Sequence, residues 1–97
     1  MDSSSVVLEK LRAKMPEMKK YGVKRIGLFG SFVRGEETEK SDLDIIVEFE
    51  KKKKTFRNYM ELRFLLEDLF DRRVDLVTRE ALKPDLRARI LRSAKYA

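Results

Sequence analysis

The chain has 97 residues, of which 42% are apolar and 41% charged, and its net charge is +6. This composition predicts one folded domain spanning residues 1–97, with a densely charged surface. Cysteine and histidine are both absent, which excludes disulfides, thiolate metal sites and histidine-based catalysis. A metal ion would therefore need oxygen ligands, which favours magnesium or manganese.

The charge pattern and the N-terminus indicate the compartment and the partners. No apolar run approaches the ~20 residues that cross a bilayer, and residues 1–5 lack the features of a signal peptide. We therefore expect a soluble, cytoplasmic protein that does not bind membranes. Residues 1–50 carry 9 basic and 10 acidic side chains, whereas residues 51–97 carry 14 basic and 7 acidic ones. The second half would attract phosphate, nucleic acid or an acidic protein, or it is simply a solvated basic surface.

The first third of the chain predicts a helix, a strand and a turn. Apolar residues recur at helical spacing over about residues 5–20, with N-cap candidates in Ser3–Ser5 and a stop at Tyr21-Gly22. Val23–Phe29 is typical of a strand. Gly30–Gly35 is bounded by glycines and predicts a turn that contains a short helical segment.

The strongest strand signal lies in the middle of the chain, after a polar loop at residues 36–41. Leu43–Phe49 alternates strictly, which places Asp42, Asp44, Ile46 and Glu48 together on the face opposite its apolar residues. The apolar face consists of Leu43, Ile45, Val47 and Phe49.

The last part of the chain adds a helix, a strand and a second helix. Phe56–Phe70 has helical spacing, Arg72–Thr78 is typical of a strand, and Pro84 suits the first turn of a final helix with an apolar stripe at Leu86 and Ile90. The predicted fold is an α/β (α+β) two-layer sandwich, a mixed sheet of three or more strands with helices packed against it.

Three aspartates interrupt the apolar strands. Asp42 and Asp44 leave the same face, and Asp75 lies inside the third strand. Half-buried carboxylates are costly without compensation, and a pair of divalent cations would provide it. Each aspartate also has a structural explanation. Asp42 would be a cap or turn residue after Ser41, and Asp44 would face water at a sheet edge. Asp75 would form a salt bridge to Arg72, Arg73 or Arg79.

The Gly30–Gly35 turn is the second candidate element. Glycine lets the backbone approach a phosphate closely, and the amides with the Ser31 hydroxyl would hold an anion. Arg34 would add positive charge or pair with the carboxylates. An ordinary surface turn is the alternative interpretation of Gly30-Ser31 taken alone.

Together, these residues resemble a known family. Gly30-Ser31, a gap of ten residues, Asp42-x-Asp44 and a later Asp75 are similar to the signature of minimal nucleotidyltransferases of the DNA polymerase β-like superfamily. The resemblance covers almost the whole chain and departs from the common pattern at Val33, where many relatives carry alanine.

The resemblance implies a role for each motif residue. Asp42, Asp44 and Asp75 would bind two Mg²⁺ ions, with Mn²⁺ as an alternative, and Asp75 would help to deprotonate the attacking hydroxyl. Gly30 and Ser31, with Arg34 beside them, would hold the outer phosphates of ATP. The reaction would be attack of a hydroxyl on the α-phosphorus with release of pyrophosphate.

The family also implies a partner. Minimal nucleotidyltransferases resemble the antitoxins of prokaryotic HEPN/MNT toxin–antitoxin pairs, which transfer AMP from ATP to a tyrosine hydroxyl of an all-helical HEPN-type toxin. A chain this short is expected to need such a partner, or a second copy of itself, to complete its cleft.

Three alternatives stay open at this point. In the first alternative, the protein is a non-catalytic antitoxin that blocks its partner by binding. Phe56 and Tyr59 would then lie at the interface, unless they belong to the core. In the second alternative, the protein is a transferase that acts on a small-molecule hydroxyl. In the third, it binds RNA through Lys51–Lys54, Arg87, Arg89 and Arg92. RNA binding is disfavoured because no aromatic platform accompanies these residues.

Overall fold

The computed structural model describes residues 3–97 and contains the predicted elements in the predicted order. The elements are α1 (Ser3–Lys20), β1 (Val23–Phe29), α2 (Ser31–Arg34), β2 (Leu43–Phe49), α3 (Phe56–Phe70), β3 (Val74–Thr78), the 3₁₀ turn η1 (Arg79–Ala81), α4 (Pro84–Ser93) and β4 (Lys95–Tyr96). Two elements, η1 and β4, were not predicted. The serines predicted as caps of the first helix are instead part of it.

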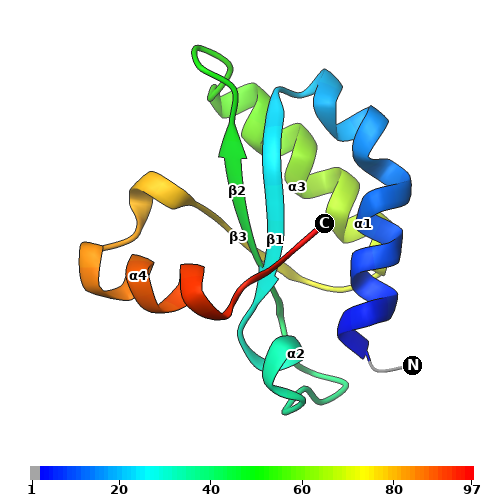
Figure 1. The fold of residues 1–97 in the computed structure, drawn as a ribbon. Coiled ribbons are helices and arrows are strands. Elements are labelled where there is room, and N and C mark those ends of the chain that lie inside the picture. The colour runs from blue at the N-terminus through cyan, green and yellow to red at the C-terminus, as the bar shows by residue number, and fades with distance from the viewer. Residues whose placement is uncertain (1–2) are drawn as a thin grey trace.

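The strands form one mixed sheet in the order β3-β2-β1-β4. β1 runs antiparallel to β2 and to β4, whereas β2 and β3 are parallel. Figure 1 shows α1 and α3 together beside the sheet and α4 standing apart from them. The mixed α+β sheet confirms the predicted fold class.

The core lies between the sheet and the α1/α3 layer. It confirms the alternation of β2, because Leu43, Ile45 and Val47 are fully buried there. α1 and α3 close this core with a stripe of buried residues each, namely Val7, Leu8, Leu11 and Met18 from α1 and Leu62 and Leu66 from α3.

The opposite face of the sheet is covered only in its middle. Ile46 is 1% exposed there, and its neighbour Gly27 in β1 lies under the Tyr96 ring of β4. The end of this face that carries Asp44 is not covered in this way, so polar side chains are accessible there.

The third strand begins two residues later than predicted, at Val74. Asp71 adopts a left-handed conformation that ends α3, and the Arg72 side chain turns back to backbone carbonyls of the 38–41 loop. Arg72 therefore acts as a loop anchor and not as a strand residue.

Two helix features differ from the predicted core. Phe56, considered both for a partner interface and for the core, is 82% exposed because it stands at the first position of α3. Tyr59, one turn later, is partly buried and donates its hydroxyl to the Leu76 carbonyl (2.6 Å). α4 has no buried residue at all.

Within residues 3–97, no helix combines the length and the apolarity needed to cross a bilayer.

We predict that Leu66→Ala lowers the free energy of unfolding by about 2–5 kcal/mol, because it opens a cavity under a fully buried side chain. Phe64→Ala is the matched control on the same helix. Phe64 is 57% exposed, so its removal should change stability by less than about 1 kcal/mol. Urea denaturation measures both, and equal losses would contradict the packing described here.

Candidate functional site

The sheet register brings two aspartates together. Asp44 of β2 lies opposite Asp75 of the parallel strand β3 and opposite Phe29 of β1. Residues opposite each other in neighbouring strands point to the same face. Leu43 and Ile45 point into the core, so Asp44 and Asp75 occupy the opposite face, at the uncovered end of the sheet.

Asp42 precedes β2 by one residue and is exposed, as is Asp75, whereas Asp44 is half-buried. The Ser41 carbonyl just before Asp42 accepts a hydrogen bond from the Arg72 guanidinium (2.7 Å), and that guanidinium lies over the Phe32 ring. These contacts hold the loop that leads into Asp42.

The three carboxylates interact electrostatically. Burial raises the pKa of Asp44 above its usual value, and the negative charges of Asp75 and then Asp42 raise it further. The Arg34 guanidinium and the backbone N–H of Ser31, which donates a hydrogen bond to this carboxylate, lower the pKa in part. The site therefore concentrates negative charge at Asp44.

Asp75 forms none of the salt bridges considered for it. Arg79 pairs with Glu48 (3.7 Å), and Arg72 binds the carbonyls of the 38–41 loop. Among the described ion pairs, none includes Asp75 or Arg73. A salt bridge therefore does not explain the presence of Asp75 in this strand.

The Gly30 turn is packed against the Asp44 carboxylate. Gly30 has φ 76° and ψ −148°, a conformation that essentially only glycine adopts. A Cβ atom at this position would collide with Asp44, at 2.8 Å from Cγ and closer still to Oδ2. The first turn of α2 thus lies directly over the carboxylate, and the Ser31 amide, one of the predicted anion donors, is already bonded to it.

Arg34 lies at the end of the same turn. It lines a cavity with Asp44 and Gly30, but its Nε donates to Glu36 (2.7 Å) and not to an aspartate. Of the two roles predicted for Arg34, the structure therefore contains the added positive charge and not an ion pair with one of the site aspartates.

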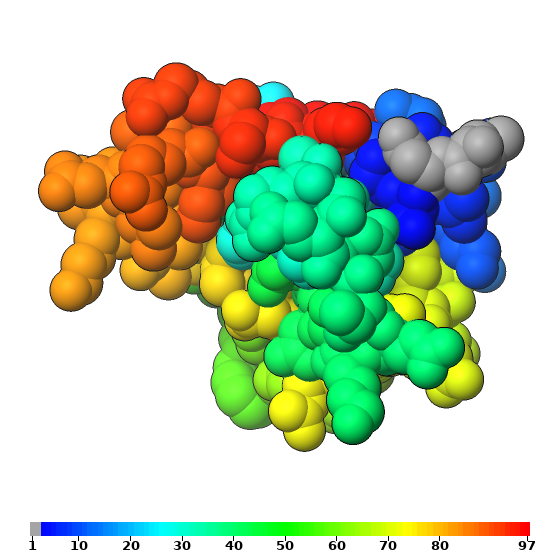
Figure 2. Space-filling view, turned by 90° about the horizontal axis from the view of Figure 1, so that it is seen from below, coloured from blue at the N-terminus to red at the C-terminus, as the bar shows by residue number. Residues whose placement is uncertain are grey.

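The cavity beside Asp44 has a volume of about 350 Å³. One wall comes from the end of β1 and from α2, and the other from α4, which contributes Leu86, Arg89, Ile90 and Ser93. Figure 2 shows the two chain segments, α2 in teal and α4 in orange to red, side by side on one face of the molecule. We call this cavity the aspartate cleft.

The α4 wall was missed in the sequence. Leu86 and Ile90 were recognised only as an apolar helix stripe, and Arg89 only as an RNA contact. Their spacing with Ser93 is the one signal that places all four on a single helix face.

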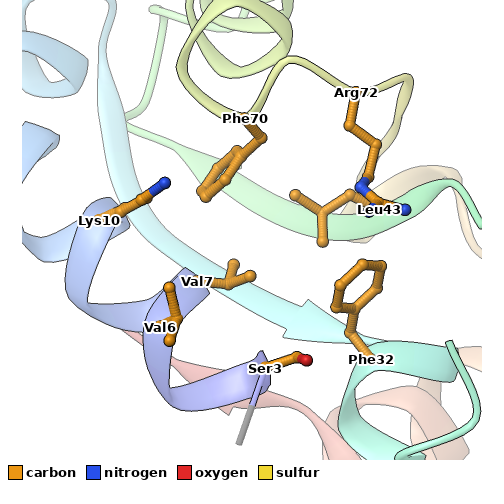
Figure 3. A pocket seen from close by; sticks show the side chains of 8 residues that line it. All are labelled: Ser3, Val6, Val7, Lys10, Phe32, Leu43, Phe70 and Arg72. Carbon is orange, nitrogen blue, oxygen red and sulfur yellow. The ribbon is translucent and has the colours of Figure 1, made fainter. Parts of the chain in front are cut away.

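A second hollow lies between α1, α2 and the end of α3, with a volume of about 270 Å³. Figure 3 shows its apolar floor, which includes Val7, Leu43 and Phe70, with the cations Lys10 and Arg72 at its sides. It is lined by no carboxylate, so it lacks the chemistry of the aspartate cleft.

The donor atoms at the aspartate cleft fit a hard divalent cation. Asp44 lines the cleft, Asp75 and Asp42 act on it electrostatically, and all three offer carboxylate oxygen. Burial and then repulsion raise the pKa of Asp44, and a bound cation would offset both. Within residues 3–97, however, no three acidic side chains are gathered tightly enough to hold an ion by themselves. Mg²⁺ commonly takes one or two carboxylates and completes its shell with substrate phosphates and water.

Comparisons with known proteins agree with this geometry. A family-level sequence model described as "Nucleotidyltransferase domain" matches residues 8–97. A relative from Thermococcus cleftensis, named protein adenylyltransferase MntA, is 44% identical over 77 residues, which cover 79% of this chain and 77% of the relative.

Two solved structures share the fold. One, described as a provisionally assigned minimal nucleotidyltransferase, is 39% identical with a TM-score of 0.76, and the match covers 98% of this chain and 95% of that one. The other, described as a toxin–antitoxin with AMP-PNP, is 26% identical with a TM-score of 0.68, and the match covers 97% and 71% of the two chains.

We predict that Gly30→Ala damages the site more than Gly35→Ala does. Both glycines have positive φ, so both substitutions strain the backbone, but only the new Cβ at position 30 meets Asp44. A Cβ at Gly35 has nothing within 4 Å. Urea denaturation and calorimetric ATP titration measure the two effects. Equal ATP affinity in both variants would contradict the close packing of Gly30 on Asp44.

We also predict that Asp44→Asn stabilises the protein at neutral pH when EDTA removes divalent cations. A carboxyl whose pKa is raised by folding keeps its proton longer in the native state, so stability falls as pH rises above the usual value of 3.8. The gain in the variant should therefore shrink as the pH approaches that value from above.

Denaturation curves from pH 3 to 8 check this, with Asp68→Asn on the exposed side of α3 as the control. A destabilised Asp44→Asn variant at neutral pH would show that the Asp44 charge is compensated within the chain.

Proposed function

Because the chain belongs to the nucleotidyltransferase domain family, we propose that it is a protein adenylyltransferase that transfers AMP from ATP to a tyrosine hydroxyl of a HEPN-type toxin and so acts as its antitoxin. The observation that carries the proposal is the setting of Asp44, which lines the aspartate cleft, lies opposite Asp75 of the parallel strand and is packed against the Gly30 turn. The name of the Thermococcus cleftensis relative and the toxin–antitoxin structure with AMP-PNP support the activity and the partner.

The nucleotide would lie in the aspartate cleft with its phosphates at the Gly30 turn. The absence of a Cβ at Gly30 lets the backbone come close to the phosphates as well as to Asp44. The Ser31 hydroxyl and the Arg34 guanidinium are the side-chain donors of this turn. The Ser31 amide links this turn to the Asp44 carboxylate by a hydrogen bond.

Asp42, Asp44 and Asp75 would hold Mg²⁺ or Mn²⁺ together with the nucleotide, and the bound cations would neutralise the charge that develops on the phosphates. Asp44, half-buried and opposite Asp75, would be the central oxygen ligand of this group. Burial, and then the negative charges of Asp75 and Asp42, raise the pKa of Asp44, and a bound cation would offset these costs.

The proposed step is an in-line displacement. The acceptor oxygen forms a bond to the α-phosphorus, and the bond from that phosphorus to the bridging oxygen of the β-phosphate breaks. Pyrophosphate leaves with the electron pair, and the hydroxyl proton passes to the Asp75 carboxylate. Asp75 is exposed at the edge strand β3, where an acceptor side chain has access.

We predict that a HEPN-type toxin partner of this protein gains the mass of one adenylyl group (AMP less water) when both are incubated with ATP and Mg²⁺. Asp44→Ala should lower the rate by about 10²-fold or more, since it removes the central acid of the cleft. Asp68→Ala, an exposed aspartate outside the cleft, is the control. Intact-mass spectrometry measures the product, and peptide mapping identifies the modified residue.

A toxin that is neutralised equally by wild type and Asp44→Ala, with no mass gain, would reject catalysis and favour an antitoxin that blocks by binding. Modification at a residue other than tyrosine would overturn the assignment of the acceptor alone.

A further inference from the structure

The helix α4 presents one face to the aspartate cleft. Leu86, Arg89, Ile90 and Ser93 follow the spacing i, i+3, i+4 and i+7, which places them on one side of a helix, and all four line the cleft. Neighbouring positions of the helix, such as Arg92, do not line it.

This face is not packed into the core. None of the residues of α4 is buried, and Leu86 is 41% exposed. The helix is instead held near its two ends. Arg87 donates to the carbonyls of Arg79 (3.1 Å) and Leu82 (3.0 Å), and β4, which follows the helix, pairs with β1. The middle of the helix, where Arg89 stands, therefore faces a space that a ligand can fill.

Arg89 is a cation without a protein counterion there. Among the ion pairs and side-chain hydrogen bonds described for residues 3–97, none uses its guanidinium, although Arg34 across the cleft is paired with Glu36. The charges that act on Asp44 are those of Asp75, Asp42 and Arg34. Arg89 therefore does not serve as the counterion of this carboxylate.

An arginine in this position suits an anionic ligand with several oxygens. The guanidinium offers a planar fork of donors that matches phosphate in a bidentate manner. Leu86 and Ile90 flank it with apolar surface, which weakens screening by water and strengthens such a contact.

We propose that Arg89 is a second phosphate-binding residue of the aspartate cleft, which holds the terminal phosphates of the nucleoside triphosphate from the wall opposite the Gly30 turn. This inference rests on the proposed function for the presence of the nucleotide, but the sequence resemblance assigns no role to Arg89 or to α4. Arg89 and the Gly30 turn would then clamp the phosphate chain from two sides.

Calorimetric titration with ATP and with AMP tests the proposal, because AMP lacks the terminal phosphates. Arg89→Ala should weaken ATP binding by about 10- to 100-fold, the loss expected for a hydrogen bond between charged groups, and should leave AMP binding unchanged. Arg89→Lys keeps the charge but loses the fork, so its ATP affinity should lie between those of wild type and Arg89→Ala. Arg92→Ala, on another face of α4, is the matched control and should bind ATP as wild type does.

ATP affinity that is the same in Arg89→Ala and Arg92→Ala would overturn the inference, and so would an equal loss of ATP and AMP binding, which indicates a distorted cleft. Thermal unfolding without ligand checks that the variants fold. A wild-type protein that binds no ATP would overturn the nucleotide assignment itself. ATP binding without modification of the toxin would reject the proposed acceptor and leave the role of Arg89 supported.

Discussion

The contact between Gly30 and the Asp44 carboxylate is the constraint on which the rest of the site depends. It requires a residue without a Cβ at the end of β1, a left-handed backbone there, and a helical turn that begins at once. It also joins two elements that are far apart in sequence, because the Ser31 amide bonds to an acid of β2. This contact thus sets the position of α2 relative to Asp44.

Parallel pairing of β2 and β3 supplies the third acid. The register sets Asp75 beside Asp44, so residues on two strands share one face without any salt bridge between them and the nearby arginines. The Glu67 carboxylate accepts a hydrogen bond from the Val74 amide (3.3 Å) and ties the start of β3 to α3. Helix packing on one side of the sheet therefore positions an acid on the other side.

Most helices and strands could be predicted from local sequence patterns, because the periodicity within each element matches the positions that it buries in the core. The alternation in β2 and the helical stripe of α3 both match buried positions, so each element could be recognised by itself. β4 was not predictable, since two residues carry no periodicity and Tyr96 is placed by Gly27 across the sheet. The aspartates and the glycine–serine turn could be selected from the sequence by their types and spacing. The α4 wall could not, because this helix has no buried residue and its position depends on the contacts near its two ends.

The way α4 is held near its two ends also matters for the release of product in the proposed reaction. Moving α4 outward would expose little apolar surface, so its displacement costs far less free energy than unfolding the α1/α3 layer. In the proposed reaction, the pyrophosphate product would leave by a local movement of α4, while the hydrophobic core stays intact. The wall of the cleft and the hydrophobic core are thereby separate parts of the chain.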